Sequence, residues 1–498
     1  MSLERILLNG ELPRIIQGGM GVAVSNWRLA RAVSMEGQLG VVSGTGIDVI
    51  LARRLQEGDK DGRMRAAIAE FPIRRIADEV LDRYFVEGGK DFSKPYVPTP
   101  FPKLKQDGKN LTLESNHLQN LIVLANFVEV YLAKQGHNGK VGINLLHKVQ
   151  HLIPQGLYGA MLAGVDAVLI GAGLPKSIPD ALDALVTGET LSMPFPVNGG
   201  KSYRLEFDSN SFMGEHIEIR RPAFLGIVSN QVPIKFLPNA EGYIIEGLSP
   251  FDNGEVIQGP LAGGHNAGPR KKGELSAAGE LVYGLRDKTD FEILNGMLDR
   301  RVEGGGNVQP YWLVGGCSTS LKKSIDLGAT GVQVGTLFAT SIESGIKYEN
   351  KEKMIESILD GASVFADPNA SPTGYPFQVF PLDGSLSEKD VYGARKRVCD
   401  MGGLLEFFED ADGVVRSRCA SEPVHLYTGK GGTLESAAYR KCLCQALVSW
   451  AGFPTVRKDG SVEPSIATLG RDTSSVRELL EIHGRYSAAD AINLIKAS

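Results

Sequence analysis

The sequence of 498 residues lacks the features that mark several large classes of protein. It has no basic excess, and its net charge of −5 argues against a surface built mainly for binding nucleic acid. Its first residues contain no apolar run of signal-peptide length, so we expect a cytoplasmic protein. The longest apolar stretch, residues 121–133, contains Asn126 and Glu129 and is too short to cross a bilayer. We therefore expect neither nucleic acid nor membrane among its partners.

Cysteine is scarce, and four of the five cysteines lie in one C-terminal segment. Disulfides are disfavoured in the cytoplasm, so a metal explains such clustering better than cross-links do. Cys399, Cys419, Cys442 and Cys444 would supply four soft ligands, enough for tetrahedral zinc or for an iron–sulfur cluster. The alternative is four free thiols buried in the core.

The composition is that of a globular protein, with 42% hydrophobic and 22% charged residues. Short apolar runs alternate with glycine turns and helical stretches, which predicts a parallel sheet. Eight such units are typical of the TIM (β/α)8 barrel, although an open doubly wound sheet would show the same local pattern. The strands are expected at residues 14–18, 39–43, 141–145, 167–170, 223–228, 243–245, 312–314 and 331–334.

The alternation also predicts the domain organisation. Residues 1–345 are expected to form the barrel, interrupted by insertions at about residues 72–116 and 187–221, where the periodicity fails. Residues 346–498 lack the alternation and are expected to be a C-terminal extension that carries the cysteine cluster. No long linker precedes this extension, so we expect it to pack on the barrel.

The segment from residue 311 to residue 340 has the pattern of a phosphate cradle. One apolar strand ends in Gly315 and Gly316, a helix follows, and the next strand ends in Gly335 and Thr336. Glycines at strand ends let backbone N–H groups approach an anion, and in TIM barrels the loops after the last two strands commonly hold a phosphate. The alternative is a structural unit whose glycines serve only tight turns.

Further glycine-rich turns follow other strands and would meet at the same mouth of the barrel. A cofactor with one flat face and a phosphate at one end is FMN. Met20 is expected against its isoalloxazine ring, Asn144 at the polar edge of the ring, and Glu246 at a ribityl hydroxyl or a ring nitrogen, unless Glu246 is a capping residue. The expected cofactor-binding residues are Gly18, Gly19, Met20, Gly21, Asn144, Glu246, Gly263, Gly264, Gly315, Gly316, Gly335 and Thr336.

Among the eight histidines, His265 is the best candidate for a catalytic residue. It lies in a glycine-flanked loop, and an ordinary histidine pKa near neutrality suits proton transfer. The alternative is a loop histidine exposed to water. His147 and His151 have helical ligand spacing but no third ligand nearby in the sequence, so we expect a surface pair.

Five motifs together resemble the nitronate monooxygenase family, formerly called 2-nitropropane dioxygenases, and the related FMN-dependent enoyl-ACP reductases. The similarity extends from about residue 12 to residue 345. The motifs are IIQGGMG at residues 15–21, GIN at 142–144, AGGH at 262–265, GG at 315–316 and GATGVQVGT at 328–336. Each motif is weak alone, but their order and spacing are specific.

The resemblance implies an FMN-binding TIM barrel in which His265 meets a small-molecule substrate. It further implies oxidation of alkyl nitronates by dioxygen to a carbonyl compound and nitrite. The alternative on the same fold is an NAD(P)H-dependent enoyl reductase acting on an acyl carrier substrate. A third hypothesis is an accessory protein whose extension binds a carrier protein. The chain could also form a homodimer. Residues 371–377, SPTGYPF, are expected to help close the pocket.

Overall fold

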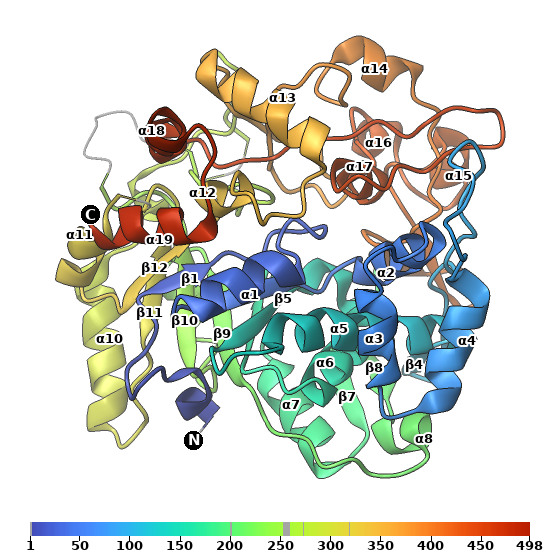
Figure 1. Ribbon diagram of the computed structural model, residues 1–498, viewed down its shortest axis with the longest axis horizontal. Helices are drawn as coiled ribbons and strands as arrows, with labels where there is room; N and C mark the ends of the chain where they lie inside the picture. The colour runs from blue at the N-terminus through green and yellow to red at the C-terminus, as the bar shows by residue number, and fades with distance from the viewer. Residues whose placement is uncertain (1, 200–201, 252–258, 272, 318) are drawn as a thin grey trace.

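Eight parallel strands form one sheet that closes into a barrel in the computed structural model (Figure 1). The sheet order is β1-β12-β11-β10-β9-β6-β5-β2, and the two outer strands meet through a parallel bridge between Ile16 and Leu39. This closure confirms the predicted TIM barrel and excludes an open doubly wound sheet. The strands are β1 (Ile15–Gln17), β2 (Gly40–Ser43), β5 (Val141–Leu146), β6 (Ala167–Gly171), β9 (Ala223–Val228), β10 (Gly242–Glu246), β11 (Tyr311–Val314) and β12 (Gly331–Val334).

The structure describes residues 2–199, 202–251, 259–271, 273–317 and 319–498. None of the helices in these ranges combines the length and the apolar character needed to cross a bilayer.

The barrel strands are short apolar runs because both of their faces are buried. Side chains that point inward, such as Val41, Leu169, Leu225 and Trp312, fill the barrel as a separate apolar cluster. Trp312 is fully buried, and its indole N–H donates to the Pro13 carbonyl at 2.7 Å. The interior is therefore a packed core, and ligands can bind only at the ends of the barrel.

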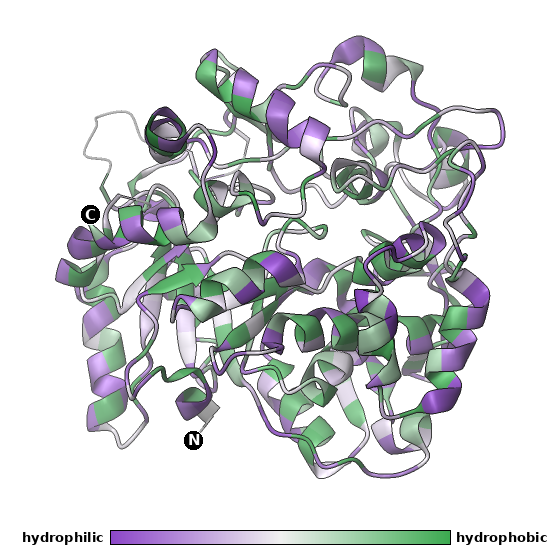
Figure 2. Ribbon diagram, viewed as in Figure 1, coloured by the Kyte–Doolittle hydropathy of each residue, from purple (hydrophilic) through white to green (hydrophobic). Residues whose placement is uncertain are grey.

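Helices surround the barrel and turn their apolar faces toward it (Figure 2). Asn26 caps helix α1 because its side chain accepts a hydrogen bond from Leu29 N at 2.9 Å, which satisfies one of the free N–H groups at the helix N-terminus. The helices of the barrel region are η1 (Ser2–Ile6), α1 (Trp27–Met35), α2 (Ile47–Gln56), α5 (Asn116–Lys134), η2 (His147–Leu152), α6 (Ile153–Leu162), α7 (Ile178–Thr187), α9 (Gln231–Ile234), η3 (Leu285–Asp287), α10 (Phe291–Glu303), α11 (Leu321–Asp326) and α12 (Thr336–Ala339).

Two segments that interrupt the alternation of strand and helix pair with each other. Parallel pairing of Asn110 with Arg204 and of Leu111 with Leu205 joins them into one four-stranded sheet beside the barrel. This joining was not expected from the sequence. The elements are α3 (Arg63–Ala69), α4 (Arg74–Tyr84), β3 (Leu104–Asp107) and β4 (Asn110–Leu113) in the first segment, and β7 (Leu191–Phe195), β8 (Tyr203–Phe207) and α8 (Ser209–Met213) in the second.

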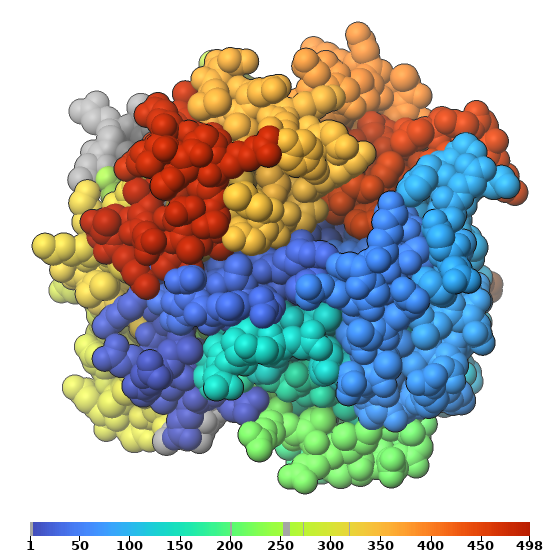
Figure 3. Space-filling model, in the orientation of Figure 1, coloured from blue at the N-terminus to red at the C-terminus, as the bar shows by residue number. Residues whose placement is uncertain are grey.

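The residues after 345 lie over the carboxyl end of the barrel, as the orange and red segments of Figures 1 and 3 show. Arg53 of α2 donates to Thr455 Oγ1 at 2.8 Å, and Tyr486 donates to the Leu337 carbonyl at 2.8 Å. The elements are α13 (Tyr348–Leu359), β13 (Phe365–Asp367), β14 (Phe377–Val379), α14 (Lys389–Ala394), β15 (Glu406–Glu409), β16 (Val415–Arg418), α15 (Val424–Gly429), α16 (Leu434–Ala437), α17 (Leu443–Trp450), α18 (Ser474–His483) and α19 (Ala488–Lys496).

Candidate functional site

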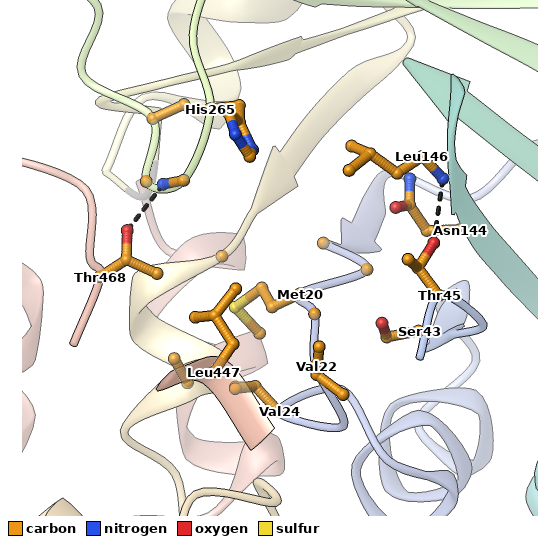
Figure 4. Close-up of a pocket in the computed structure, with 18 of the residues that line it drawn as sticks. Met20, Val22, Val24, Ser43, Thr45, Asn144, Leu146, His265, Leu447 and Thr468 are labelled. Atoms are coloured by element: carbon orange, nitrogen blue, oxygen red, sulfur yellow. Dashed lines mark hydrogen bonds between the residues drawn. The ribbon is translucent and has the colours of Figure 1, made fainter. Parts of the chain in front are cut away.

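A cavity of about 320 Å³ lies between the carboxyl ends of the barrel strands and the C-terminal extension, residues 346–498, which is also called the C-terminal segment below. Figure 4 shows His265 and Thr468 on one side of it and Asn144 and Thr45 on the other. The structure places the whole predicted set of cofactor and catalytic residues in the wall of this one cavity: Gly18, Gly19, Met20, Gly21, Asn144, Glu246, Gly263, Gly264, His265, Gly315, Gly316, Gly335 and Thr336.

The turn after β1 passes so close to β5 that only glycine fits. A Cβ atom at Gly19 would lie 2.2 Å from Cβ of Asn144. Ser25 holds the turn in place, because its hydroxyl donates to the Gly18 carbonyl at 2.7 Å and accepts from Met20 N at 2.8 Å. Met20 is thereby directed toward Gly335, where an added Cβ would lie 3.5 Å from the Met20 sulfur. The resulting wall consists of backbone with one thioether against it.

The turn after β11, which was predicted to hold a phosphate, has a backbone conformation that requires glycine. Gly315 and Gly316 have φ angles of +94° and +66°, which L side chains rarely adopt. Cys317 is buried beside them, and burial raises the pKa of its thiol to about 12. A thiol with such a pKa stays protonated, so this cysteine is not a reactive nucleophile.

Two buried polar atoms of residues that line the cavity, Gln333 Oε1 and Trp450 Nε1, have no partner among the described residues, and Gln333 is the one that belongs to a barrel strand. Gln333 lies on β12 with 8% of its surface exposed, and its Oε1 atom accepts no hydrogen bond there. An unsatisfied buried acceptor is costly, so it marks a place where a ligand donor would fit. Gln333 could not be singled out from the sequence, because inside a strand it is indistinguishable from a polar core residue.

His265 is held by residues of the C-terminal segment. Its Nε2 atom shares a hydrogen bond of 2.7 Å with Ser371 Oγ, and its ring packs edge-on against Phe377 at 5.0 Å. Burial, and then the charge of Lys148, hold the pKa of His265 well below its usual value. The ring is therefore neutral at pH 7, which favours a hydrogen-bonding or base role over that of a positive partner for an anion.

A second titratable pair lies near His265 and includes a residue that the sequence did not single out. Burial lowers the pKa of Lys148 to about 7, and burial raises the pKa of Glu246 to about 7. The Lys148 ammonium lies 3.6 Å from the centre of the Tyr375 ring. The only sequence signal for Lys148 was its place two residues after a strand that ends at the mouth.

A strap from the C-terminal segment crosses the barrel mouth at residues 468–470. Thr468 Oγ1 accepts from Gly264 N at 2.8 Å, and Gly470 N donates to Thr336 Oγ1 at 2.8 Å. A Cβ atom at Gly263 would lie 2.8 Å from the carbonyl carbon of Leu469, so the strap and the AGGH loop are in close backbone contact. The strap thus forms one wall of the cavity.

The predicted metal centre is not supported. Nowhere in the described ranges do three or more His, Cys, Asp or Glu side chains come together as a metal site. A hydrogen bond to Cys419, followed by burial, raises the pKa of Cys399, and burial raises the pKa of Cys442 and takes that of Cys444 to about 11. The four cysteines are close in the sequence, but their sulfur atoms are not arranged as a tetrahedral ligand set. Cys399, Cys419, Cys442 and Cys444 are free thiols.

The expectation of a surface pair at His147 and His151 is wrong. His151 is 1% exposed and hydrogen-bonds the Gly402 carbonyl at 3.0 Å, and Gln150 Nε2 contacts His147 Nε2 at 2.7 Å. Burial lowers the pKa of both rings to about 4. The segment is a 3-10 turn with a non-helical break at Val149, so the helical spacing does not apply.

Solved structures of three oxidoreductases are similar to this chain. FabK from Thermotoga maritima is 14% identical, with 100% of this chain and 93% of that chain covered and a TM-score of 0.45. Nitroalkane oxidase from Streptomyces ansochromogenes is 12% identical, with 100% and 97% covered and a TM-score of 0.42. The enoyl reductase domain of MlnA from Bacillus amyloliquefaciens is 11% identical, with 76% and 65% covered and a TM-score of 0.37. No protein-family model and no curated protein matches the chain.

Proposed function

We propose that this chain is an FMN-dependent oxidoreductase. The observation that carries the proposal is that the glycine ends of β1, β11 and β12 line one cavity of about 320 Å³, a size within the usual range for ligand pockets. The backbone at Gly19 leaves no room for a side chain, so this part of the wall is bare backbone, as a flat ring requires. The unpartnered Gln333 Oε1 offers an acceptor to a cofactor donor.

The residues divide the site into a cofactor end and a substrate end. Gly315, Gly316, Gly335 and Thr336 would hold the phosphate, and Met20 with the first glycine turn would lie along the ring. When bound, the flavin supplies exchange of one or two electrons with organic substrates, nicotinamides or dioxygen. His265 would meet the substrate, and its hydrogen bond to Ser371 keeps the ring in place.

The substrate end favours reduction of an α,β-unsaturated thioester. Apolar side chains of the C-terminal extension line the cavity, and Figure 4 shows one of them, Leu447, beside Met20. These surfaces suit an acyl chain. In this reaction NAD(P)H would be oxidised to NAD(P)+, its hydride would reach Cβ by way of the bound cofactor, a proton would add to Cα, and the C=C bond would become single. The apolar residues from the C-terminal segment are Met401, Leu404, Leu443, Leu447 and Trp450.

Oxidation of alkyl nitronates by dioxygen is the second candidate. It is favoured by the Lys148 ammonium, which lies near His265 and has no hydrogen-bond partner among the described residues. A nitronate is an anion, and a buried cation would attract it. Both reactions use the same cofactor end of the cavity, so the cofactor can be tested before the substrate.

The test is anaerobic flavin absorbance of the purified protein. We expect a yellow protein that NADPH or NADH bleaches and that a crotonyl thioester then re-oxidises. Bleaching by propionate 3-nitronate without any nicotinamide would move the assignment to the second candidate. A colourless protein that takes up no added FMN would overturn the proposal.

A further inference from the structure

The chain buries two lysine ammonium groups near the barrel mouth, and they differ in how they are satisfied. Lys351 Nζ donates to the carbonyls of Ser341 at 2.6 Å and of Ile342 and Ser344 at 3.3 Å. Lys148 Nζ is equally hidden from solvent but has no hydrogen-bond acceptor in the part of the chain that the structure describes. Burial of an unpaired ammonium costs several kcal/mol, so the fold keeps Lys148 at the expense of stability.

Lys148 lies next to residues that line the cavity, although it is not itself one of the lining residues. It follows β5, and its near neighbours Leu146 and Val149 both line the cavity. Its ammonium lies over the face of Tyr375, 3.6 Å from the ring centre. Tyr375 comes two residues before Phe377, which pairs with His265 in an antiparallel bridge. The Tyr375 contact therefore brings the cation to the segment that holds His265.

Lys148 is itself only partly protonated at neutral pH, because burial lowers its pKa to about 7. The carboxyl group of Glu246 on β10 is the one acidic group whose charge acts on Lys148, and it also lines the cavity. Burial raises the pKa of Glu246 to about 7, so this carboxyl carries only part of a negative charge at neutral pH. An aromatic face alone offsets only part of the cost of burying an ammonium.

We propose that Lys148 is a substrate-binding residue that holds a negatively charged oxygen atom beside His265, with Tyr375 fixing the ammonium in place. The proposal rests on the proposed function and adds the chemistry of the ligand. The oxygen belongs either to the nitronate group of a bound anion or to a thioester carbonyl on which negative charge develops as the double bond is reduced. Both are oxygen anions, and they differ in when the charge appears.

Nitrate provides a direct probe, because it is a planar oxygen anion like the nitronate group. Isothermal titration calorimetry would compare the wild type with Lys148→Met, Lys148→Arg and a control, Lys90→Met. Lys90 also lies over aromatic rings, Tyr96 at 4.5 Å and Phe92 at 5.5 Å, but its ammonium has a hydrogen-bond acceptor, the Asp91 carbonyl at 2.8 Å. We expect Lys148→Met to weaken nitrate binding at least about tenfold, and Lys148→Arg and Lys90→Met to change it less than about threefold.

Equal nitrate affinity in the wild type and in folded Lys148→Met would overturn the proposal, as would a wild type that binds no nitrate. Calorimetry needs no flavin, so a colourless protein that still binds nitrate through Lys148 would contradict the proposed function and leave this inference standing. If Lys148→Met does not fold, Lys148→Gln serves the same comparison.

Turnover distinguishes the two sources of the oxygen anion. For a nitronate the charge is already present on binding, so Lys148→Met should raise KM more than it lowers kcat. For a crotonyl thioester the charge develops in the transition state, so the same variant should lower kcat, with little change in KM. Unchanged kcat and KM with both substrates would overturn the proposal, whereas rescue by Lys148→Arg would support it.

Discussion

The Gly470 amide of the C-terminal strap donates a hydrogen bond of 2.8 Å to the hydroxyl of Thr336, the first residue of α12 after the last strand of the barrel. The two residues are 134 positions apart in the chain, yet both line the cavity. Gly470 also lies against the barrel loop before AGGH, because a Cβ atom there would be 2.7 Å from the Leu261 carbonyl oxygen. The strap and the predicted phosphate end of the site therefore form one wall.

Replacing Gly470 should weaken cofactor binding. In Gly470→Val the new side chain would displace the strap from Leu261 and Thr336, so we expect FMN affinity to fall at least about tenfold and stability to fall by about 1–3 kcal/mol. Quenching of FMN fluorescence on titration measures the affinity. Gly268→Ala is the control, because nothing lies within 4 Å of its Cβ position. Unchanged FMN affinity in Gly470→Val would mean that the strap does not contribute to the cofactor site.

Replacing His265 should separate cofactor binding from turnover. His265→Asn keeps a polar side chain in the loop but removes the ring that bonds Ser371 and packs on Phe377. We expect FMN content to stay at the wild-type level and kcat to fall by about 10²–10⁴. His425→Asn, at an exposed histidine of α15, should change neither. Loss of FMN from His265→Asn would instead make this histidine a structural residue.

Much of the site could be predicted from the sequence because it is built from strand ends. Parallel strands end at one edge, so glycines such as Gly19 and Gly335, and His265 at the end of the AGGH motif, had to converge once a barrel was predicted. Gln333, Lys148 and Gly470 could not be found in this way. Their roles depend on burial and on contacts across long stretches of chain, which local patterns do not encode.

The cysteine prediction failed for a related reason. Local spacing gives the order of Cys399, Cys419, Cys442 and Cys444 along the chain, but ligation depends on where their sulfur atoms point. In the fold the Cys399 and Cys419 thiols form a hydrogen bond with each other, and Cys444 lines the cavity wall. Similarly, the pairing of β4 with β8 joins two segments of different length and composition, and no periodicity links them.

Chelation of metal ions should leave the protein unchanged. Because the four C-terminal cysteines are free thiols with no metal-site arrangement in the described ranges, we expect no stoichiometric zinc or iron after purification. Addition of a chelator such as EDTA should not shift the Tm, since no folding free energy depends on a metal. Elemental analysis and thermal unfolding check both statements. One tightly bound metal ion per chain, lost together with stability on chelation, would contradict them.

Replacing Gln333 should change cofactor affinity and stability in opposite directions. Gln333→Leu removes the unsatisfied Oε1 atom, so the cofactor-free protein should be as stable as the wild type or more stable, while FMN affinity falls about tenfold. Gln309→Leu is the contrasting variant, because Gln309 Oε1 accepts from Arg301 at 2.6 Å and its Nε2 donates to Pro238 at 2.9 Å. That variant should lose stability and keep its FMN affinity. Equal FMN affinity in Gln333→Leu and the wild type would show that Gln333 does not meet the cofactor.

The buried Lys148 should give the stability of the protein a characteristic pH dependence. Burial lowers its pKa from 10.5 to about 7, so between these values the unfolded chain binds a proton that the folded chain does not. Stability from this group therefore rises with pH across that interval, and below about pH 7 the folded protein carries the full cost of the buried charge. Lys148→Met removes this cost.

The variant should accordingly be more stable than the wild type by about 1–3 kcal/mol near pH 6, and the gain should shrink toward zero near pH 10. Glu246 does not blur this comparison, because its pKa of about 7 leaves it mostly neutral at the lower pH and ionised at the higher pH in both proteins. Urea unfolding at the two pH values measures the difference. A variant that is less stable than the wild type near pH 6 would mean that the Lys148 ammonium is compensated in the folded protein. Lys148 would then cost the fold no stability, and its burial would not point to a substrate oxygen.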